Sequence, residues 1–187
     1  MPLNPGHLVI LARDGVVNQR CDGPITSVGS WQPIPGSLEA IARLNQAGFA
    51  VVVVTNQPAV GNGDLAISDL NAIHARLQST LARVGGHVDG IFFCPHETSS
   101  QCGCRMPAPG LMAAIASRFG IALDNVPLVG DSSVHSDTAL AVGASPIMVR
   151  TGKGRDTFEN DKHSRSFRWF DDLASATCHV LESSSSG

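Results

Sequence analysis

Short apolar runs alternate along the chain with segments in which apolar residues recur every three or four positions. Uninterrupted apolar runs are typical of buried strands, whereas the wider spacing is typical of helices with one buried face. The runs predict strands over 7–12, 49–55, 90–93, 126–129 and 146–149. The spacing predicts helices over 37–47 and 68–84, through 111–119 and 139–142, and within 170–181. Ser37 can cap the first of these helices, and Gly48 can end it.

Strands that alternate with helices predict an α/β fold with a parallel sheet. In sheets of this kind, ligands bind outside the carboxyl ends of the strands. The polar residues at those ends are Asp14, Thr55, Asn56, a loop rich in cysteine and histidine, and Asp131. We therefore expect these residues to converge on one site.

The length and composition fit one compact domain. The chain has 187 residues, of which 43% are hydrophobic and 16% are charged, so most of it has enough apolar surface to fold. We predict a single domain over 1–181, followed by a disordered serine-rich tail over 182–187. The segment 155–168 is polar and mixed in charge, and no element is predicted in it.

The charge and hydropathy exclude two classes of partner. A net charge of −3 argues against binding to nucleic acid. The apolar runs are much shorter than the ~20 residues that span a bilayer. The N-terminus lacks the basic-then-apolar layout of a secretory signal. We expect a cytoplasmic protein with neither a nucleic-acid nor a membrane partner.

Three of the five cysteines lie within eleven residues, with a histidine between them. In a cytoplasmic chain such a cluster indicates a metal site rather than a disulfide framework. Three sulfurs and one nitrogen form a closed ligand set that is typical of structural zinc. The predicted ligands are Cys94, His96, Cys102 and Cys104. The alternative is four unrelated residues of a polar loop. We interpret the other two cysteines, Cys21 and Cys178, as free thiols.

Five segments together resemble the haloacid-dehalogenase-type phosphatases. The likeness is to the branch that contains heptose 1,7-bisphosphate and histidinol-phosphate phosphatases, the heptose enzymes being closer. The segments are LARDGVVN at 11–18, TNQ at 55–57, the Cys/His loop through PAPG at 94–110, VGD at 129–131 and RTG at 150–152. The resemblance covers roughly residues 7–153. It implies a three-layer α/β domain of the haloacid-dehalogenase type, in which helices cover both faces of a parallel sheet. It also implies a zinc-binding loop and no large cap.

The chain departs from the family pattern at positions that carry its chemistry. The family's aspartyl nucleophile is replaced by Ala12, its motif-three lysine by Met106, and its second motif-four acid by His135. The second motif also departs over 58–63, where Pro58 removes a backbone donor. A methyl group cannot attack phosphorus, and loss of a nucleophile in another enzyme class costs on the order of a millionfold in turnover. The only lysines are Lys153 and Lys162, outside that motif.

The resemblance assigns roles to the residues that remain. Asp14 would be the general acid and base, although an aspartate in a turn that caps the strand is the alternative. Thr55 and Asn56 would cradle phosphate, although a cap between strand and loop is the alternative. Arg105 could bind a substrate phosphate or hydroxyl, and Asn18 follows Asp14 at the family spacing.

Magnesium in this family is held by the nucleophile, the backbone carbonyl of the second aspartate and a motif-four aspartate. Here only Asp131 and the Asp14 carbonyl remain, so we expect Mg²⁺ binding to be weak or absent. His135 either replaces an acid of that site or is a solvent-facing helix residue. Asp137 lies on another side of the same helix and is a poor substitute.

These expectations predict a family member that folds and binds structural zinc but is catalytically dead or very slow. It would retain weak binding of a small phosphorylated sugar through Arg105, Thr55, Asn56 and Asn18. Two alternatives stay open. One is an active phosphatase with a variant mechanism that relies on Asp14 and Asp131. The other is a non-catalytic binding or regulatory partner of an active paralogue; without such a partner we expect a monomer.

Overall fold

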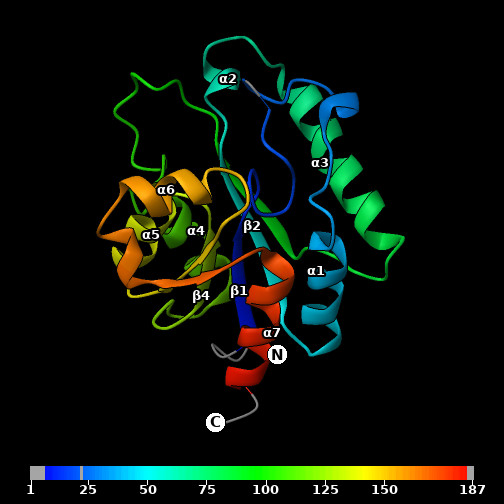
Figure 1. The fold of residues 1–187 in the computed structure, drawn as a ribbon. Coiled ribbons are helices and arrows are strands. Elements are labelled where there is room, and N and C mark those ends of the chain that lie inside the picture. The colour runs from blue at the N-terminus through cyan, green and yellow to red at the C-terminus, as the bar shows by residue number, and fades with distance from the viewer. Residues whose placement is uncertain (1–6, 22, 185–187) are drawn as a thin grey trace.

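Six parallel strands form one sheet in the computed structural model, which describes residues 7–21 and 23–184 (Figure 1). The order across the sheet is β3-β2-β1-β4-β5-β6. The strands are β1 (Leu8–Ala12), β2 (Ala50–Asn56), β3 (Gly90–Cys94), β4 (Pro127–Gly130), β5 (Ser145–Val149) and β6 (Arg168–Phe170). The predicted parallel α/β sheet is thereby confirmed.

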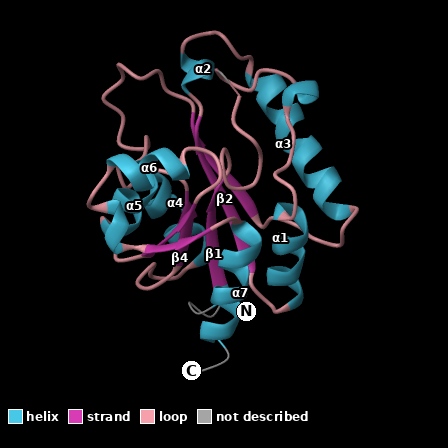
Figure 2. Ribbon diagram, in the orientation of Figure 1, coloured by secondary structure: helices cyan, strands magenta, loops and turns pink. Residues whose placement is uncertain are grey.

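Helices cover both faces of the sheet and make three layers (Figure 2). Alternate residues of β2 explain why its whole valine run is buried: Val51 and Val53 belong to the core on one face, and Val52 and Val54 to the core on the other. The first core includes residues of α1 (Ser37–Gln46), α3 (Ile67–Ala82) and α7 (Leu173–Ser184). The second includes residues of α4 (Gly110–Phe119) and α5 (Ser133–Leu140).

Glycines mark the C-terminal ends of two helices, whereas the serine that was predicted as a cap does not cap its helix. Gly48 comes directly after the cap of α1 and has φ +84°, and Gly120 ends α4 in the left-handed conformation. The prediction that Ser37 caps α1 was wrong: the cap is Gly36, and the Ser37 hydroxyl donates to the Val16 carbonyl instead. That bond ties α1 to the loop after β1.

Three short elements lie where the sequence pattern predicted none. They are α2 (Pro58–Gly61), α6 (Gly154–Asn160) and β6, and all are too short to show a period. Two 3-10 turns, η2 (Val28–Ser30) and η3 (Ser164–Ser166), occupy other loops. The helix α7 runs through Ser184, so residues 182–184 are helical rather than part of the predicted tail; residues 185–187 lie outside the described part of the chain.

The strand order reverses between β1 and β4, which lie side by side although 114 residues separate the end of one from the start of the other. In open parallel sheets this switch point is where a crevice forms. Asp14 follows β1 and Asp131 follows β4, so the topology brings the two carboxylates to the same crevice. Among the described residues no domain is inserted above it, and no helix there is long and apolar enough to cross a membrane.

Candidate functional site

The Asp14 carboxylate is the hub of a hydrogen-bond network at the end of β1. Arg13 binds it with two guanidinium nitrogens at 3.1 Å, and Asn18 Nδ2 donates to it at 2.9 Å. Thr55 Oγ1 and Gln57 Nε2 donate from the end of β2 at 3.3 and 3.2 Å. The Asp14 side chain is 21% exposed, so these donors fix the carboxylate while one side stays open to the crevice.

Arg13, which is 1% exposed, is oriented by a second residue that the sequence did not single out. His74 of α3 is buried, with its Nε2 3.2 Å from Arg13 Nη1. Burial and the neighbouring Arg13 charge lower the pKa of His74 to about 4, against an opposing effect of Asp14. A neutral His74 can accept a hydrogen bond from Arg13, and so helps to hold the Arg13–Asp14 pair.

Neither substituted residue next to this network offers a polar side chain. Ala12 is the last residue of β1 and is 1% exposed within the core. Met106 is 2% exposed, packs in the core on the other face, and lines the crevice. Within the described chain, Asp14 is therefore the only carboxylate that the first motif brings to the site.

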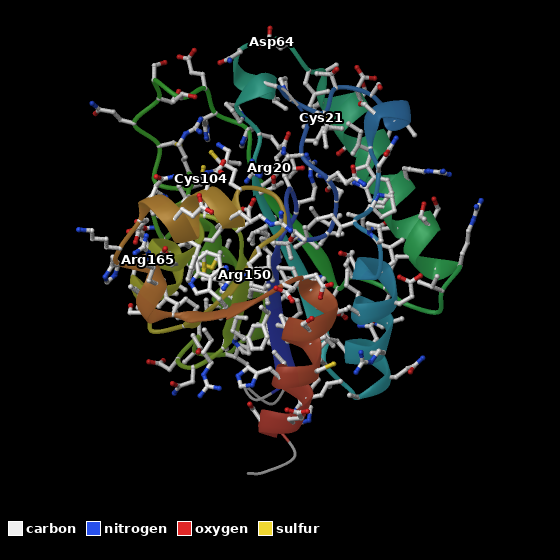
Figure 3. The ribbon with its side chains drawn as sticks, in the orientation of Figure 1. Arg20, Cys21, Asp64, Cys104, Arg150 and Arg165 are labelled. Atoms are coloured by element: carbon white, nitrogen blue, oxygen red, sulfur yellow. The ribbon has the colours of Figure 1, made fainter. Side chains whose placement is uncertain are left out.

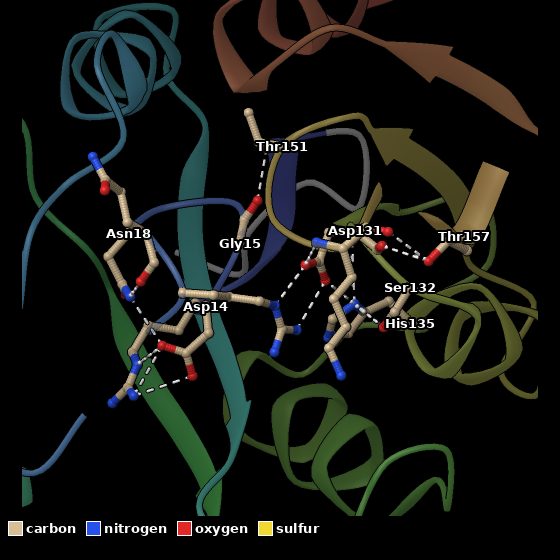
Figure 4. Close-up of polar contacts among 12 residues, drawn as sticks. Asp14, Gly15, Asn18, Asp131, Ser132, His135, Thr151 and Thr157 are labelled. Carbon is tan, nitrogen blue, oxygen red and sulfur yellow. Dashed lines mark hydrogen bonds and ion pairs between the residues drawn. The ribbon is translucent and has the colours of Figure 1, made fainter. Parts of the chain in front are cut away.

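Asp131 lies at the end of β4, close to His135 (Figure 4). It is fully buried and is paired with Arg20 from the loop after β1. Arg20 Nε donates to Oδ2 at 2.8 Å and Nη2 donates to Oδ1 at 3.1 Å. Burial alone raises the pKa of Asp131, but His135 and Arg20 outweigh it and hold that pKa well below its usual range. The same pair raises the pKa of Arg20 despite its desolvation.

His135 is buried, so the alternative of a solvent-facing helix residue is excluded. Its Nδ1 lies 3.2 Å from Asp131 Oδ1, 3.3 Å from the Asp131 backbone nitrogen and 3.1 Å from Ser132 Oγ. It thus anchors the turn that carries Asp131. Asp137 is exposed on α5, as the helix geometry indicated.

Two adjoining cavities open beside Asp14 and share Arg13, Asp14, Arg20 and Asn56. The larger, about 400 Å³, extends toward His135 of α5 and Thr157 of α6. The smaller, about 280 Å³, extends under α2. Arg20, labelled in Figure 3, lines both cavities.

Besides Arg13 and His74, the sequence reasoning missed Arg20, Gln57 and Lys153, the last of which lines the larger cavity. Gln57 was visible as part of the second motif. Nothing in the local pattern marked Arg20, whose role depends on a contact across 111 residues. Lys153 lies just beyond the last family segment, where it returns a lysine to the cavity wall that Met106 also lines.

Two of the four predicted substrate-binding residues line a cavity, and the other two do not. Thr55 and Asn56 line the larger cavity. Asn18 is fully buried and donates to Asp14, so it supports the carboxylate from behind. Arg105 donates to the His96 carbonyl and lines neither cavity.

The Cys/His loop brings four potential ligand atoms within 4.8 Å of one another. Cys94 Sγ lies 3.6 Å from Cys102 Sγ and 3.3 Å from Cys104 Sγ, and His96 Nδ1 lies 3.2 Å from the latter. A tetrahedral zinc ion with bonds of about 2.3 Å to sulfur and 2.0–2.1 Å to nitrogen separates its ligands by roughly 3.5–3.8 Å. The donor set and its spacing therefore fit a closed metal site.

The pKa values of two thiols in this cluster are shifted in opposite directions. Burial raises the pKa of the Cys94 thiol to about 12. Desolvation acts in the same direction on Cys102, but hydrogen bonds from the Arg105 backbone and the neighbouring thiols lower its pKa to about 6. One sulfur is thus ready to lose its proton to a metal ion.

The chain is similar to known phosphatases. Residues 103–176 match a family model described as HAD-hydrolase-like. A D-glycero-beta-D-manno-heptose-1,7-bisphosphate 7-phosphatase of Pseudomonas putida is 46% identical over 174 residues, 93% of this chain and 99% of the relative. A D-glycero-alpha-D-manno-heptose-1,7-bisphosphate 7-phosphatase of Mycobacterium tuberculosis is 38% identical over 149 residues, 75% of this chain and 76% of the relative.

A solved structure is similar over the whole fold. The D,D-heptose 1,7-bisphosphate phosphatase from B. bronchiseptica, complexed with magnesium and phosphate, superposes with a TM-score of 0.91. The two proteins are 43% identical, and the match covers 94% of this chain and 98% of the other.

Proposed function

Since the chain belongs to the family of D-glycero-D-manno-heptose-1,7-bisphosphate 7-phosphatases, we propose that it binds a sugar phosphate of that kind and hydrolyses it very slowly or not at all. The observation that carries this proposal is Ala12. Its methyl group ends β1 beside an otherwise complete Asp14 network, at the position where the family pattern has the attacking carboxylate.

Asp14 is held in place by its hydrogen bonds, but the site lacks the nucleophile with which a general acid and base would work. A general acid and base accelerates a displacement but does not itself attack phosphorus. Without a neighbouring nucleophile, the reaction would need direct attack by water that Asp14 activates. That route would lack the covalent intermediate that divides the reaction into two easier steps. We therefore expect at most a very slow release of phosphate.

Ligand binding is supported by the cavities and their charges. Asp14, Thr55 and Asn56 lie on the wall of the larger cavity, together with the cations Arg20 and Lys153. Guanidinium and ammonium groups around a cavity of this size suit a phosphate ester with a small polyol. The relatives named above act on both the beta and the alpha bisphosphate, so the choice of anomer is open to the same experiment.

We further propose that the ion held by Cys94, His96, Cys102 and Cys104 is zinc. Three thiolates and one imidazole at near-tetrahedral spacing are the donor set that structural zinc takes, and they leave no position for a reactant. Zinc there would order the loop that leads to Met106, which lines the larger cavity.

The experiment compares phosphate release and ligand binding in one preparation. Wild type, Asp14→Asn and Ala12→Asp are each mixed with heptose 1,7-bisphosphate of either anomer, with magnesium, and both released phosphate and heat of binding are measured. We expect binding by wild type, with no more phosphate release than from Asp14→Asn. Release by wild type at least tenfold above Asp14→Asn, or no measurable binding, would overturn the proposal.

A further inference from the structure

Three hydrogen bonds already bind the Asp131 carboxylate in this structure. A carboxylate offers roughly four lone-pair sites. Arg20 Nε and the Lys153 backbone N–H donate to Oδ2 at 2.8 and 2.9 Å. Arg20 Nη2 donates to Oδ1 at 3.1 Å, and His135 Nδ1, which accepts from the Asp131 backbone N–H at 3.3 Å, lies 3.2 Å from the same oxygen.

Steric packing closes the same carboxylate from two further sides. A Cβ placed on Gly15 would lie 2.0 Å from Asp131 Oδ2, and one placed on Gly152 would lie 2.2 Å from it. The Asp131 side chain is 0% exposed. A metal ion that approaches the Asp131 carboxylate must therefore first displace the Arg20 guanidinium.

The expected magnesium ligands do not fit the ion. Mg²⁺ requires near-octahedral oxygen ligands at about 2.0–2.1 Å. Of the family's set, Ala12 supplies no oxygen and the buried Asp131 carboxylate already binds three donors, which leaves only the Asp14 backbone carbonyl free for a metal ion. His135 adds a nitrogen that faces the same carboxylate. The described residues at this position thus form a closed ion pair rather than a metal site.

Arg20 also supplies the positive charge that such an ion would bring. It is the buried carboxylate's partner, and it lines both cavities beside Asp14. Nε and Nη2 bind Asp131, whereas within residues 7–21 and 23–184 no hydrogen bond reaches Nη1. One third of the side chain, 33%, remains exposed. A guanidinium held in this way presents donors that match phosphate oxygens.

We infer that Arg20 is a built-in replacement for the divalent cation: it excludes metal from Asp131 and lets the larger cavity bind phosphate without magnesium. Lys153, on the wall of that cavity, is the second cation of the phosphate site. Arg20 would neutralise Asp131 in this way whether or not the chain turns over a sugar phosphate.

Wild-type protein provides the first test, with inorganic phosphate as the probe and calorimetry as the readout. We expect Kd values within about twofold of each other in EDTA and in saturating magnesium. Phosphate binding that is absent in EDTA and appears with magnesium would overturn the inference. The metal itself is tested with Mn²⁺ by electron paramagnetic resonance, where wild type should leave the free-ion signal unchanged.

Variants distinguish the effect of Arg20 on phosphate and metal binding from a general effect of surface charge. Arg20→Ala should weaken phosphate binding at least about tenfold, the cost of one charge-assisted contact, and should reduce the free Mn²⁺ signal because Asp131 becomes available. Arg118→Ala, an exposed arginine of α4, should change neither. Lys153→Ala should weaken phosphate binding without admitting Mn²⁺, and Lys162→Ala serves as its exposed control.

Loss of the fold in Arg20→Ala would be visible by circular dichroism, and the wild-type measurements then decide alone. Saturation of wild type by Mn²⁺ overturns the inference even when no sugar phosphate is hydrolysed. Fast hydrolysis by wild type in EDTA overturns the proposed function and leaves the role of Arg20 intact. The two failures are therefore distinguishable.

Discussion

Asn56 and Met106 are joined by a reciprocal pair of hydrogen bonds between the end of β2 and the loop before α4. Asn56 Nδ2 donates to the Met106 carbonyl at 3.0 Å, and the Met106 N–H donates to Asn56 Oδ1 at 3.1 Å. The pair fixes the backbone of residue 106 beside the larger cavity, which the Met106 side chain lines. The backbone is thus held in place at the position where the family pattern has a lysine.

Restoring the family residues should therefore restore turnover only when Arg20 is removed as well. Ala12→Asp with Met106→Lys returns a nucleophile and an ammonium to the positions where the family pattern has them, but Arg20 still occupies Asp131. We expect the double variant to gain less than about tenfold in magnesium-dependent phosphate release, and the triple variant with Arg20→Ala to gain at least a further hundredfold, about 2.7 kcal/mol in the barrier.

The control for that series is Asp14→Asn in the triple variant, which should return release to the wild-type level. Equal activity of the double and triple variants would show that Arg20 does not obstruct the restored site. No activity in either would mean that other differences, such as those over 58–63, also matter.

Metal removal should loosen one loop while the sheet persists. A structural zinc contributes about 10–16 kcal/mol of apparent binding free energy in small zinc domains. Cys104→Ser should lower bound zinc from one ion per chain toward none, lower the melting temperature, and expose the segment 95–105 to proteolysis. Elemental analysis, a thermal melt and limited digestion measure the three effects. Cys178→Ser, exposed and outside the cluster, should match wild type in all three.

Gly152 should be intolerant of any side chain because of Asp131, beyond the cost of its backbone conformation. At φ +59° an alanine costs roughly 1–2 kcal/mol. Gly120, with φ +67° and no atom within 4 Å of an added Cβ, isolates that backbone cost. We expect Gly152→Ala to lower the free energy of unfolding by about 2 kcal/mol more than Gly120→Ala does, because its Cβ must push Asp131 away. Urea titration measures both, and equal losses would contradict the packing argument.

His74 should make the protein less stable as the pH falls from 6.5 to about 4. Its pKa is lowered in the folded state, so in this interval the unfolded chain binds a proton that the folded chain does not. The free energy of unfolding should therefore fall with falling pH, by up to about 3 kcal/mol. His74→Gln, which keeps an acceptor for Arg13, should flatten the profile in this interval, whereas His163→Gln at an exposed position should not. Parallel profiles for wild type and His74→Gln would refute the role of His74.

Much of the sheet could be predicted because its central strands are long apolar runs that need no tertiary information. The valine run of β2 is buried on both faces, and no other local structure suits it. The strand β6 could not be predicted in this way, since three residues that pair only with β5 carry no detectable period. Ser37 failed as a cap for a related reason: its partner, the Val16 carbonyl, comes from a distant loop.

The site was predictable as far as its residues lie at strand ends. Asp14, Thr55, Asn56 and Asp131 converge because parallel strands end at one edge of the sheet. Arg20 was not predictable, since an arginine in a loop rich in glycine and proline carries no signal until the fold brings Asp131 to it. The proposal that Arg20 replaces a metal ion at Asp131 rests on that contact.

Phosphorus NMR of wild-type protein mixed with an equimolar amount of heptose 1,7-bisphosphate and excess magnesium observes binding and hydrolysis in one sample. We expect both phosphate resonances of the sugar to shift or broaden on binding and to keep their total intensity over many hours. Disappearance of the 7-phosphate resonance within minutes, with inorganic phosphate in its place, would contradict the conclusion that a chain with Ala12 at the end of β1 holds its ligand without cleaving it.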